Sequence, residues 1–487
     1  MPASWIRVLF WCFLFVLVWA EGTFLNPADP DLWHRFALAD YLLRTHHFPA
    51  GDTFSYLADY RLVADHEWGS SFIFYPLYFG IGPAAIVGLK LVTMLLTLAF
   101  TVWAGLHGRR PTVLFAAFYA VVLMALLPSF GSTLRCGAFT HFFLALWLYW
   151  FQRERHGSPV PLWFYPATMI IWANLHGGFA LGLAWLLAVA LVHFVLGRPW
   201  QTWLARFGLS LAATLVNPFG WHLWVSTARA LVMPRADFGE WSPPSWWPAP
   251  WELPGYKLLF GITVIAILFL LGRRGWRRLD RVALLLIGGA MALSLSSARH
   301  DSLFAIITGA LLPDLIPHER TLQSIEDPIR RLSYLFIRFA LVLVPLFLAL
   351  SIVPRGDGFR LHYPPESCPA GAVDFLRRQN VQGKLLLPFN YGSYAIWNLR
   401  GRMRVSMDGR YDLVYRAATY QRVKNFFLAK DDWTSLLTAP APDAVLVPMN
   451  VPVFSKMETE PGWREAYHDK TDAVFLPNAR PPQITGI

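Results

Sequence analysis

Residues 83–106 read PAAIVGLKLVTMLLTLAFTVWAGL and contain one charged side chain, Lys90. An α-helix of this length is long enough to cross the hydrocarbon core of a bilayer, which is about 30 Å thick. No water is available there to bind backbone N–H and C=O groups, so a helix, which satisfies them internally, is the expected structure. The segment therefore predicts a transmembrane helix.

Apolar runs of comparable length recur along most of the chain, and we expect about eleven spans in all. They lie near residues 4–20, 83–106, 112–128, 138–151, 160–176, 178–197, 207–232, 257–272, 281–298, 302–316 and 332–353. The first run ends in Val18-Trp19-Ala20, and a tryptophan fits poorly in a small-residue cleavage site. We therefore expect an uncleaved anchor and not a signal peptide.

The composition agrees with a membrane protein. Of 487 residues, 55% are apolar, 16% are aromatic and 15% are charged, whereas soluble domains have about 25% charged residues. The formal net charge of +11 could indicate a nucleic-acid-binding protein. The basic residues are not gathered on one face or tail, however, so we expect no nucleic-acid partner. Three widely spaced cysteines give neither a disulfide framework nor a metal-ligand pattern.

The basic residues in the predicted loops indicate the orientation. Alternate loops contain fourteen arginines, and the opposite set contains seven Arg or Lys residues. Because cytoplasmic loops have the excess of Arg and Lys, we expect a cytoplasmic N-terminus. An odd number of spans then places the first loop, the 233–256 loop and everything after residue 353 on the non-cytoplasmic side.

Near residue 354 the composition changes to that of a soluble domain. Predicted strands alternate there with predicted helices, which indicates a small α/β domain. The strands are 384–388, 403–407, 443–448 and 473–477, and the helices are 369–380, 391–399 and 413–438. The predicted fold class is therefore mainly α, with a polytopic transmembrane bundle over 1–353 and a soluble α/β domain over 354–487.

The first predicted loop, residues 21–80, contains two acidic clusters. Asp29 and Asp31 directly follow the first span, and Asp65-His66-Glu67 precedes an amphipathic run. A carboxylate at a membrane exit, beside apolar walls, is expected to have the raised pKa of a general base. Two such carboxylates equally predict ligands for a divalent cation, Mg or Mn, held against phosphate oxygens. Solvated loop charges are the alternative interpretation.

Other polar groups lie at predicted span ends on the same side. They are Arg135, His176 in WANLHGGF (172–179), and the pair Arg299-His300. Ionisable groups at membrane depth are costly, so their recurrence suggests a shared polar cavity. A cationic pair such as Arg299 with His300 is suited to bind a lipid phosphate. Taken singly, each is more simply an interface-anchoring residue.

The stretch from Asp31 to Asp40, DLWHRFALAD, lies at a characteristic distance past the first span. It resembles the first loop of the GT-C glycosyltransferases, which include protein O-mannosyltransferases, lipid A aminoarabinose transferases and the catalytic subunit of oligosaccharyltransferase. In that family an acidic residue at this place is the proposed base or metal ligand, and Asp31 is its match. The family's second acidic residue precedes a Lys-Pro-Pro segment. Glu67 occupies that place, but the Lys-Pro-Pro is absent, which implies a divergent bacterial branch.

A second, weaker similarity lies in the C-terminal domain. Residues 388–394 (PFNYGSY) and 408–410 (DGR) resemble the Trp-Trp-Asp-Tyr-Gly region of oligosaccharyltransferase, which helps bind the acceptor. The two tryptophans and the aspartate are missing, so sequon binding is not implied. Contact of Tyr391, Asp408 and Arg410 with an acceptor is one expectation. A strand–turn–helix element that uses its two glycines for backbone reasons is the other.

The resemblance implies a membrane glycosyltransferase of the bacterial inner membrane, with its C-terminal domain in the periplasm. It would move a sugar from a polyprenyl-phosphate-linked donor, held among membrane lipid, to a glycan, lipid or protein acceptor, with inversion. Asp31 would be the base or a metal ligand with Asp29, and Glu67 would support it. Arg135, Arg299 and His300 would bind the donor phosphate. The acceptor or its cavity would involve His34, Asp65, His66, His176, Tyr391, Asp408 and Arg410.

Two other classes of function remain open from the sequence. A transporter or flippase of lipid-linked intermediates would also need many spans, but it would more naturally have mid-span charges and repeated halves. A non-catalytic assembly protein of the cell envelope would tolerate loss of the first-loop acids. Turnover of a lipid-linked sugar distinguishes the enzyme from both.

Overall fold

The structure, a computed structural model, describes residues 3–109, 111–130, 134–235, 237–246, 253–316 and 356–478. The chain divides into two compact units. Unit 1 comprises Met1–Pro27, Leu77–Gly220 and Arg235–Leu361, and unit 2 comprises Ala28–Pro76, Trp221–Pro234 and His362–Ile487. Most of the first predicted loop therefore belongs to the same compact unit as the C-terminal domain. The predicted last span and the predicted boundary at residue 353 lie outside the described residues.

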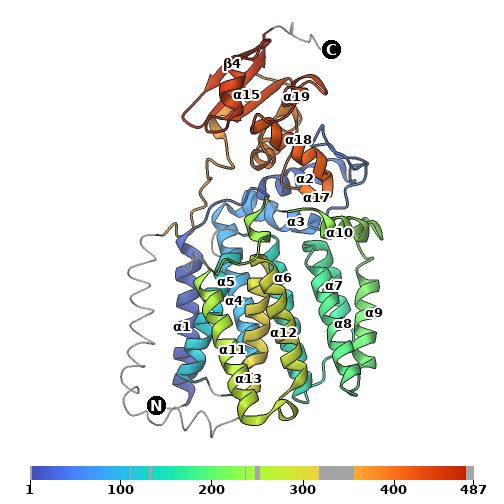
Figure 1. Ribbon diagram of the computed structural model, residues 1–487, viewed down its shortest axis with the longest axis vertical. Helices are drawn as coiled ribbons and strands as arrows, with labels where there is room; N and C mark the ends of the chain where they lie inside the picture. The colour runs from blue at the N-terminus through green and yellow to red at the C-terminus, as the bar shows by residue number, and fades with distance from the viewer. Residues whose placement is uncertain are drawn as a thin grey trace. The chain divides into compact units, whose positions relative to one another are not determined.

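Unit 1 is helical, and Figure 1 shows its helices running alongside one another. The helices are α1 (Ala3–Phe24), α4 (Ala84–Leu106), α5 (Val113–Phe130), α6 (Gly137–Arg155), α7 (Phe164–Leu175), α8 (Phe179–Val195), α9 (Gln201–Ala213), α11 (Pro254–Arg274), α12 (Arg281–Ser296) and α13 (Asp301–Leu315). All but α9 coincide with a predicted apolar run, and α9 overlaps only the start of the predicted 207–232 run. The mainly α class is confirmed.

Of the helices in the described ranges, three are long and apolar enough to cross a membrane, judged by length and composition. They are Arg7–Phe24, Ala84–Leu106 and Pro254–Arg274. Three more are apolar but shorter, namely Leu114–Leu127, Phe179–Val195 and Arg281–Ser296. The count of about eleven spans therefore stays a prediction.

The predicted span 207–232 is two separate helices. Helix α9 ends at Ala213, and α10 (His222–Val232) begins after a break and belongs to unit 2. Between them the Asn217 side chain bonds three nearby backbone groups, and Gly220 adopts a φ of 54°. The next residue after Asn217 is a proline, which lacks an N–H and disfavours a helical residue before it. The Asn-Pro-Phe-Gly sequence therefore ends the helix.

Unit 2 contains a mixed sheet of five strands in the order β2-β1-β3-β5-β4. The strands are β1 (Gly383–Leu386), β2 (Met403–Val405), β3 (Ala444–Pro448), β4 (Trp463–His468) and β5 (Asp472–Pro477). β1 pairs in parallel with β2 and β3, while β5 pairs antiparallel with β3 and β4. Four of the five were predicted. β4 was missed because its side chains are largely exposed and polar, as an edge strand allows.

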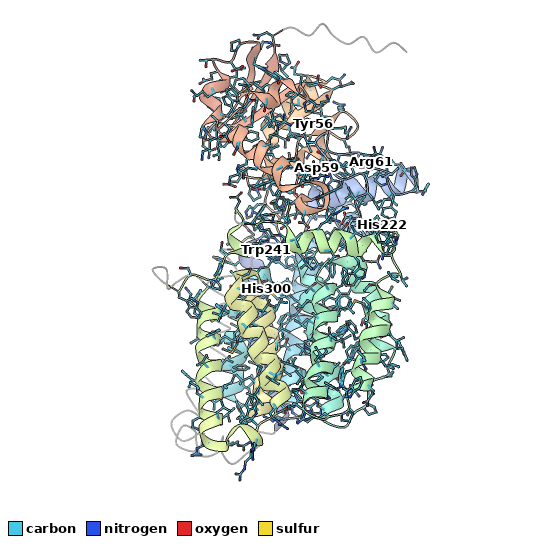
Figure 2. The ribbon with its side chains drawn as sticks, turned by 45° about the vertical axis from the view of Figure 1, so that its right-hand side comes forward. Tyr56, Asp59, Arg61, His222, Trp241 and His300 are labelled. Carbon is cyan, nitrogen blue, oxygen red and sulfur yellow. The ribbon has the colours of Figure 1, made fainter. Side chains whose placement is uncertain are left out.

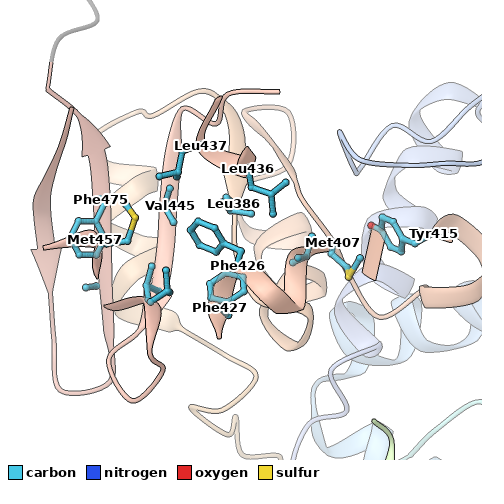
Figure 3. Close-up of a cluster of buried hydrophobic side chains, with 14 of the residues drawn as sticks. Leu386, Met407, Tyr415, Phe426, Phe427, Leu436, Leu437, Val445, Met457 and Phe475 are labelled. Carbon is cyan, nitrogen blue, oxygen red and sulfur yellow. The ribbon is translucent and has the colours of Figure 1, made fainter. Parts of the chain in front are cut away.

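The helices of unit 2 come from the first loop, from the segment of α10 and from the C-terminal domain. They are α2 (Leu32–Thr45), α3 (Trp68–Pro76), α10, α15 (Ala370–Arg378), α16 (Gly392–Asn398), α17 (Tyr411–Val414), α18 (Ala417–Phe427), α19 (Ser435–Thr438) and α20 (Val453–Met457). Figure 3 shows Phe426 of α18 beside Leu386 and Val445 of the sheet. All three are fully buried. Each such side chain contributes about 1.5–3 kcal/mol when removed from water.

The first loop adds a short extended segment to the open edge of the sheet at β2. Ser55 pairs in parallel with Val405, and the Tyr56 N–H donates to the Val405 carbonyl at 3.0 Å. Further along the same loop, which Figure 2 marks by Tyr56, Asp59 and Arg61, the Asp59 N–H donates to the Val414 carbonyl at 3.0 Å. An edge strand offers unpaired backbone groups to such an added segment. The first loop and the C-terminal domain therefore share one hydrogen-bonded structure.

Candidate functional site

Asp31 immediately precedes α2 and is half-buried. Its backbone N–H donates to Oδ1 of Asp29 at 2.9 Å. Asp29 itself is only 4% exposed. Of the two acids that follow the first predicted span, Asp31 is thus the one that solvent reaches, while Asp29 holds the backbone from which Asp31 projects.

The turn Asp408-Gly409-Arg410 of the C-terminal domain packs directly against Asp31. A Cβ atom built on Gly409 would overlap Oδ1 of Asp31 and would lie 3.1 Å from its Cγ. The Gly409 N–H donates to Oγ of Ser393 at 3.4 Å. A Cβ on Gly392 would overlap the backbone carbonyl just before the turn. Both glycines therefore serve close backbone approach, and Gly409 brings the turn against Asp31.

Arg410 is the centre of a buried charge network. Its Nε and Nη2 donate to the two carboxylate oxygens of Asp408 at 2.8 and 2.7 Å. Its Nη1 and Nη2 donate to the carboxylate of Asp52, in the first loop, at 2.7 and 3.1 Å. The side chains of Arg410, Asp52 and Asp408 are 5%, 2% and 0% exposed. These charges bind one another and are not presented to solvent.

The pKa values in this network follow from the ion pairs. Burial alone would raise the pKa of the Asp408 carboxyl, but the Arg410 guanidinium and the Tyr415 hydroxyl, which donates at 2.8 Å, hold that pKa below its usual value. Burial likewise would lower the pKa of Arg410, but Asp408 and Asp52 raise it. Asp408 and Arg410 are therefore an ionised pair at neutral pH. Asp408 and Arg410, two of the residues predicted to contact the sugar acceptor, therefore have buried structural partners.

His34 lies one helical turn after Asp31 and is 2% exposed. Neither ring nitrogen has a hydrogen-bond partner within the described part of the chain. Burial, then the neighbouring charges of Arg35 and Arg410, hold the pKa of His34 well below its usual value. The imidazole is therefore neutral near pH 7 and provides no positive charge.

The second acidic cluster of the first loop gathers around Arg35. The Arg35 Nη1 donates to both oxygens of Asp65, at 2.9 and 2.8 Å, and its Nη2 lies 3.3 Å from Oε2 of Glu67. Nε2 of His66 lies 3.9 Å from Oε1 of Glu67. Burial would raise the pKa of Asp65, but Arg35, His66 and the Glu67 N–H together lower it. Asp65 is therefore an ionised partner of Arg35.

Tyr391 also has a protein partner. Its hydroxyl donates to Oδ1 of Asp472, in β5, at 2.7 Å, and the side chain is buried. Burial and the negative charge of Asp472 raise the pKa of Tyr391, so the phenol stays protonated and remains a donor. This contact ties the start of α16 to the sheet.

In unit 1, Arg135 and Arg299 converge on Glu240. Arg135 Nη1 donates to Oε2 of Glu240 at 2.8 Å, and Arg299 Nη1 donates to Oε1 at 2.7 Å. The Arg299 guanidinium also lies over the Trp241 ring, 4.7 Å from its centroid. Figure 2 shows Trp241 near His300, and their ring centroids are 6.4 Å apart. The three predicted phosphate-binding residues, Arg135, Arg299 and His300, thus lie together in this unit.

His176, also in unit 1, belongs to a local hydrogen-bond chain. Its Nδ1 accepts from the Gly178 N–H at 3.0 Å and lies 2.7 Å from the hydroxyl of Thr140. The Thr140 hydroxyl in turn accepts from the Trp172 indole at 2.9 Å. These bonds join α6 to the loop between α7 and α8.

The predicted site residues fall into two sets. Asp29, Asp31, His34, Asp65, His66, Glu67, Tyr391, Asp408 and Arg410 belong to unit 2, and Arg135, His176, Arg299 and His300 belong to unit 1. Within the residues that the structure describes, no three His, Cys, Asp or Glu side chains are grouped to hold a metal ion. Sequence reasoning missed Arg35 and Asp52 as structural partners. The role of Arg35 as a partner of the acidic residues could have been predicted from the sequence, since Arg35 lies one helical turn after Asp31.

Comparison with solved structures identifies the fold. The mycobacterial arabinofuranosyltransferase AftD matches with a TM-score of 0.51 and 14% identity, over 99% of this chain and 40% of its own length. An oligosaccharyltransferase of Archaeoglobus fulgidus, solved with a tethered acceptor peptide containing the NVT sequon, matches with a TM-score of 0.56 and 11% identity, over 91% of this chain and 69% of its own. The fold is that of a GT-C glycosyltransferase.

The predicted GT-C fold is therefore confirmed, and at these identities the likeness concerns the fold alone. The chain spans less than half the length of AftD. No family profile matches the sequence, and no curated protein matches it.

Proposed function

We propose that this protein is a membrane glycosyltransferase that moves a sugar from a polyprenyl-phosphate-linked donor to an acceptor on the exoplasmic side of the membrane. One observation supports it most. In a chain with the GT-C fold, the half-buried carboxylate of Asp31 lies at the start of α2, against the glycine turn of the C-terminal domain. A half-buried carboxylate on a rigid support suits the proposed role of base, because proton transfer needs a positioned group.

In the proposed reaction, Asp31 takes the proton from an acceptor hydroxyl. The acceptor oxygen attacks the anomeric carbon of the sugar, and the bond from that carbon to the phosphate oxygen breaks, so that its electron pair leaves with the phosphate. Attack and departure occur on opposite faces of the carbon, and a single displacement therefore inverts the anomeric configuration. Glu67 has a supporting role, since Arg35 binds it together with Asp65.

A phosphate leaving group needs charge stabilisation more than it needs a proton. Arg299 and Arg135 would stabilise this charge, and their side chains are 41% and 53% exposed. Both bind Glu240, so an arriving phosphate would compete with that carboxylate. His300 lies beside them, and burial lowers its pKa. It would therefore act as a neutral hydrogen-bond donor.

A divalent cation, Mg²⁺ or Mn²⁺, is a further proposed component. Mg²⁺ is commonly bound by one or two carboxylates together with substrate phosphates, and the adjacent Asp29 and Asp31 fit such a ligand set. Oδ1 of Asp29 already accepts the Asp31 N–H, so Asp31 would be the principal ligand, as the alternative to its role as the base. Bound there, the ion would provide positive charge for the phosphate oxygens, and no step above depends on it.

Asp31→Asn tests the proposal. Purified full-length protein is incubated with undecaprenyl phosphate linked to radiolabelled mannose, glucose or arabinose. A glycan, a lipid or a protein is added as the acceptor, and the released undecaprenyl phosphate is measured for each. Loss of a general base typically lowers the rate by about 10²–10⁴-fold. Asp40→Asn is the matched control, because Asp40 lies nine residues after Asp31 on the same helix, where it pairs with Arg44 and Arg400.

Wild-type turnover by Asp31→Asn would remove this carboxylate from the mechanism. Absence of turnover by the wild-type protein with every donor would favour the transporter or assembly alternatives, neither of which releases the carrier phosphate.

A further inference from the structure

We infer that Gly409 is a positioning residue for Asp31, and that the turn Asp408-Gly409-Arg410 fixes the direction of the Asp31 carboxylate. The inference rests on the proposed function, since it takes Asp31 to act on the substrate. It assigns to the C-terminal domain a part in building the reacting centre, in addition to any contact with the acceptor.

The contact between Gly409 and Asp31 leaves no room for a side chain. A Cβ on Gly409 would overlap Oδ1 of Asp31, while its next neighbour outside the aspartate, Oγ of Ser393, would be 3.4 Å away. Gly409 is not among the residues with positive φ, so the backbone itself would accept alanine. The need for glycine at this position therefore comes from the Asp31 carboxylate.

The turn is held rigidly behind this contact. Oδ1 of Asp408 accepts from both the backbone N–H and the Nε of Arg410, at 3.0 and 2.8 Å, which closes the turn over Gly409. On its inner side, Gly392 approaches so closely that its Cβ would overlap the backbone just before Asp408. The turn consequently has little space to retreat, and a methyl group on Gly409 would displace the carboxylate.

The helix that follows Asp31 is anchored to the same domain. Trp33 of α2 meets Tyr394 of α16 edge to face, with ring centroids 5.1 Å apart. Phe36 meets Trp397 in the same way at 5.7 Å. The backbone of Asp31 is fixed in addition by Asp29. With its backbone held on one side and its oxygen bounded by Gly409 on the other, the Asp31 side chain has few positions available.

Gly409→Ala is the direct test, because it moves the end of a side chain and leaves the fold in place. We expect kcat for undecaprenyl phosphate release to fall about 100-fold, since a misplacement of about 1 Å is enough for such a loss. KM for the undecaprenyl-phosphate-linked sugar and the unfolding temperature should stay close to wild type. A purely structural role would lower the unfolding temperature along with kcat.

Two further glycines of unit 2 are controls. In the first loop, a Cβ on Gly51 would lie 3.6 Å from the Arg61 carbonyl, an ordinary contact, so Gly51→Ala should retain wild-type kcat. Gly392→Ala would press on backbone, which cannot move aside as a side chain does. It should lower the unfolding temperature and kcat together and so show the pattern of structural damage.

A second variant keeps the inference testable should Gly409→Ala not fold. Ser393→Ala removes the hydroxyl that accepts the Gly409 N–H and loosens the turn without adding an atom. A severalfold fall in kcat at unchanged KM is expected, and unchanged kcat contradicts the inference.

The outcomes distinguish failure of the proposed function from failure of the positioning role of Gly409. Activity in Asp31→Asn overturns the proposed function, and the positioning role with it. Loss of activity in Asp31→Asn together with wild-type kcat in Gly409→Ala overturns only the positioning role. If Gly409→Ala is as unstable as Gly392→Ala, Ser393→Ala decides, and unchanged kcat in that variant overturns the positioning role.

Discussion

Replacing Arg410 with methionine is expected to destabilise unit 2 by about 3–5 kcal/mol, the range for breaking a buried ion pair. The guanidinium lies between two carboxylates, Asp52 and Asp408, whose side chains are 2% and 0% exposed. Methionine would fill much of the same volume but would leave both carboxylates without their cation. The cost is thus the cost of two unpaired buried charges.

The magnitude follows from the contacts. Arg410 donates four side-chain hydrogen bonds to these two carboxylates. Each bond to a charged group contributes about 1.5–3 kcal/mol, so a simple sum would give about 6–12 kcal/mol. That sum is an overestimate, because an unpaired carboxyl takes up a proton instead of remaining charged. The lower range of about 3–5 kcal/mol is therefore the expected one.

The change of stability with pH should have opposite signs in the wild-type protein and in Arg410→Met. In the wild-type protein the pKa of Asp408 is lowered in the folded state. Its contribution is therefore present above the unfolded pKa and is lost as pH falls through the folded one. Without Arg410, burial would raise the folded pKa above the unfolded one. The variant should then gain stability as pH falls from 8 to 5.

Hydrogen exchange at the sheet edge measures this effect in the full-length protein. The amides of Tyr56 and Val405 join the first loop to β2, and their exchange reports the free energy of opening. A loss of about 3–5 kcal/mol accelerates exchange by roughly 10²–10⁴-fold. Arg378→Met is the control, because Arg378 is 77% exposed in its pair with Asp374, and such pairs contribute about 0–1 kcal/mol.

Exchange within threefold of wild type in Arg410→Met, or stability of that variant that does not rise as pH falls from 8 to 5, would refute this reasoning. The triple variant Asp52→Asn, Asp408→Asn, Arg410→Met should recover much of the loss, because no charge is then left unpaired.

Two further predictions concern residues with competing interpretations. Arg299→Ala should raise KM for the lipid-linked donor about tenfold with little change in the unfolding temperature, because the side chain is 41% exposed and a bond to a charged group contributes about 1.5–3 kcal/mol; steady-state kinetics at low and high salt measure this, and an unchanged KM contradicts the assignment. Tyr391→Phe should destabilise unit 2 by about 1–3 kcal/mol, since Asp472 loses its buried donor, while KM for the acceptor stays constant. Denaturant unfolding and acceptor titration measure the two effects, and a raised acceptor KM at unchanged stability would restore the acceptor role for Tyr391.

Helices and strands could be predicted from the sequence where a local run of apolar residues determines the structure. A long apolar run such as 83–106 has few alternatives to a helix, because backbone groups must be satisfied within the segment, and α4 has nearly those limits. The buried strands β1, β3 and β5 were recognisable as short apolar runs for a similar reason. The exposed strand β4 has no such signal.

The partners of the charged residues were beyond local rules. Asp408 and Arg410 were expected at an acceptor cavity, yet Arg410 binds both Asp408 and Asp52, and Asp52 is 358 positions from Arg410 in the sequence. Nothing in the spacing of the three residues connects them, and single-sequence reasoning has no means to pair charges at that separation. The same holds for Gly409. Its motif suggested a backbone role, but only the fold brings Asp31 to it.

That pairing explains how a loop can carry a residue that needs accurate placement. Reacting groups are often on loops held by a rigid scaffold, and here the scaffold comes from the far end of the chain. The first loop bonds to the edge of β2 through Ser55 and Tyr56, and Arg410 binds it through Asp52. Gly409 then limits the position of the Asp31 carboxylate. The first loop would lose each of these supports without the C-terminal domain, so in the proposed enzyme that domain is required for catalysis itself and not only for the choice of acceptor.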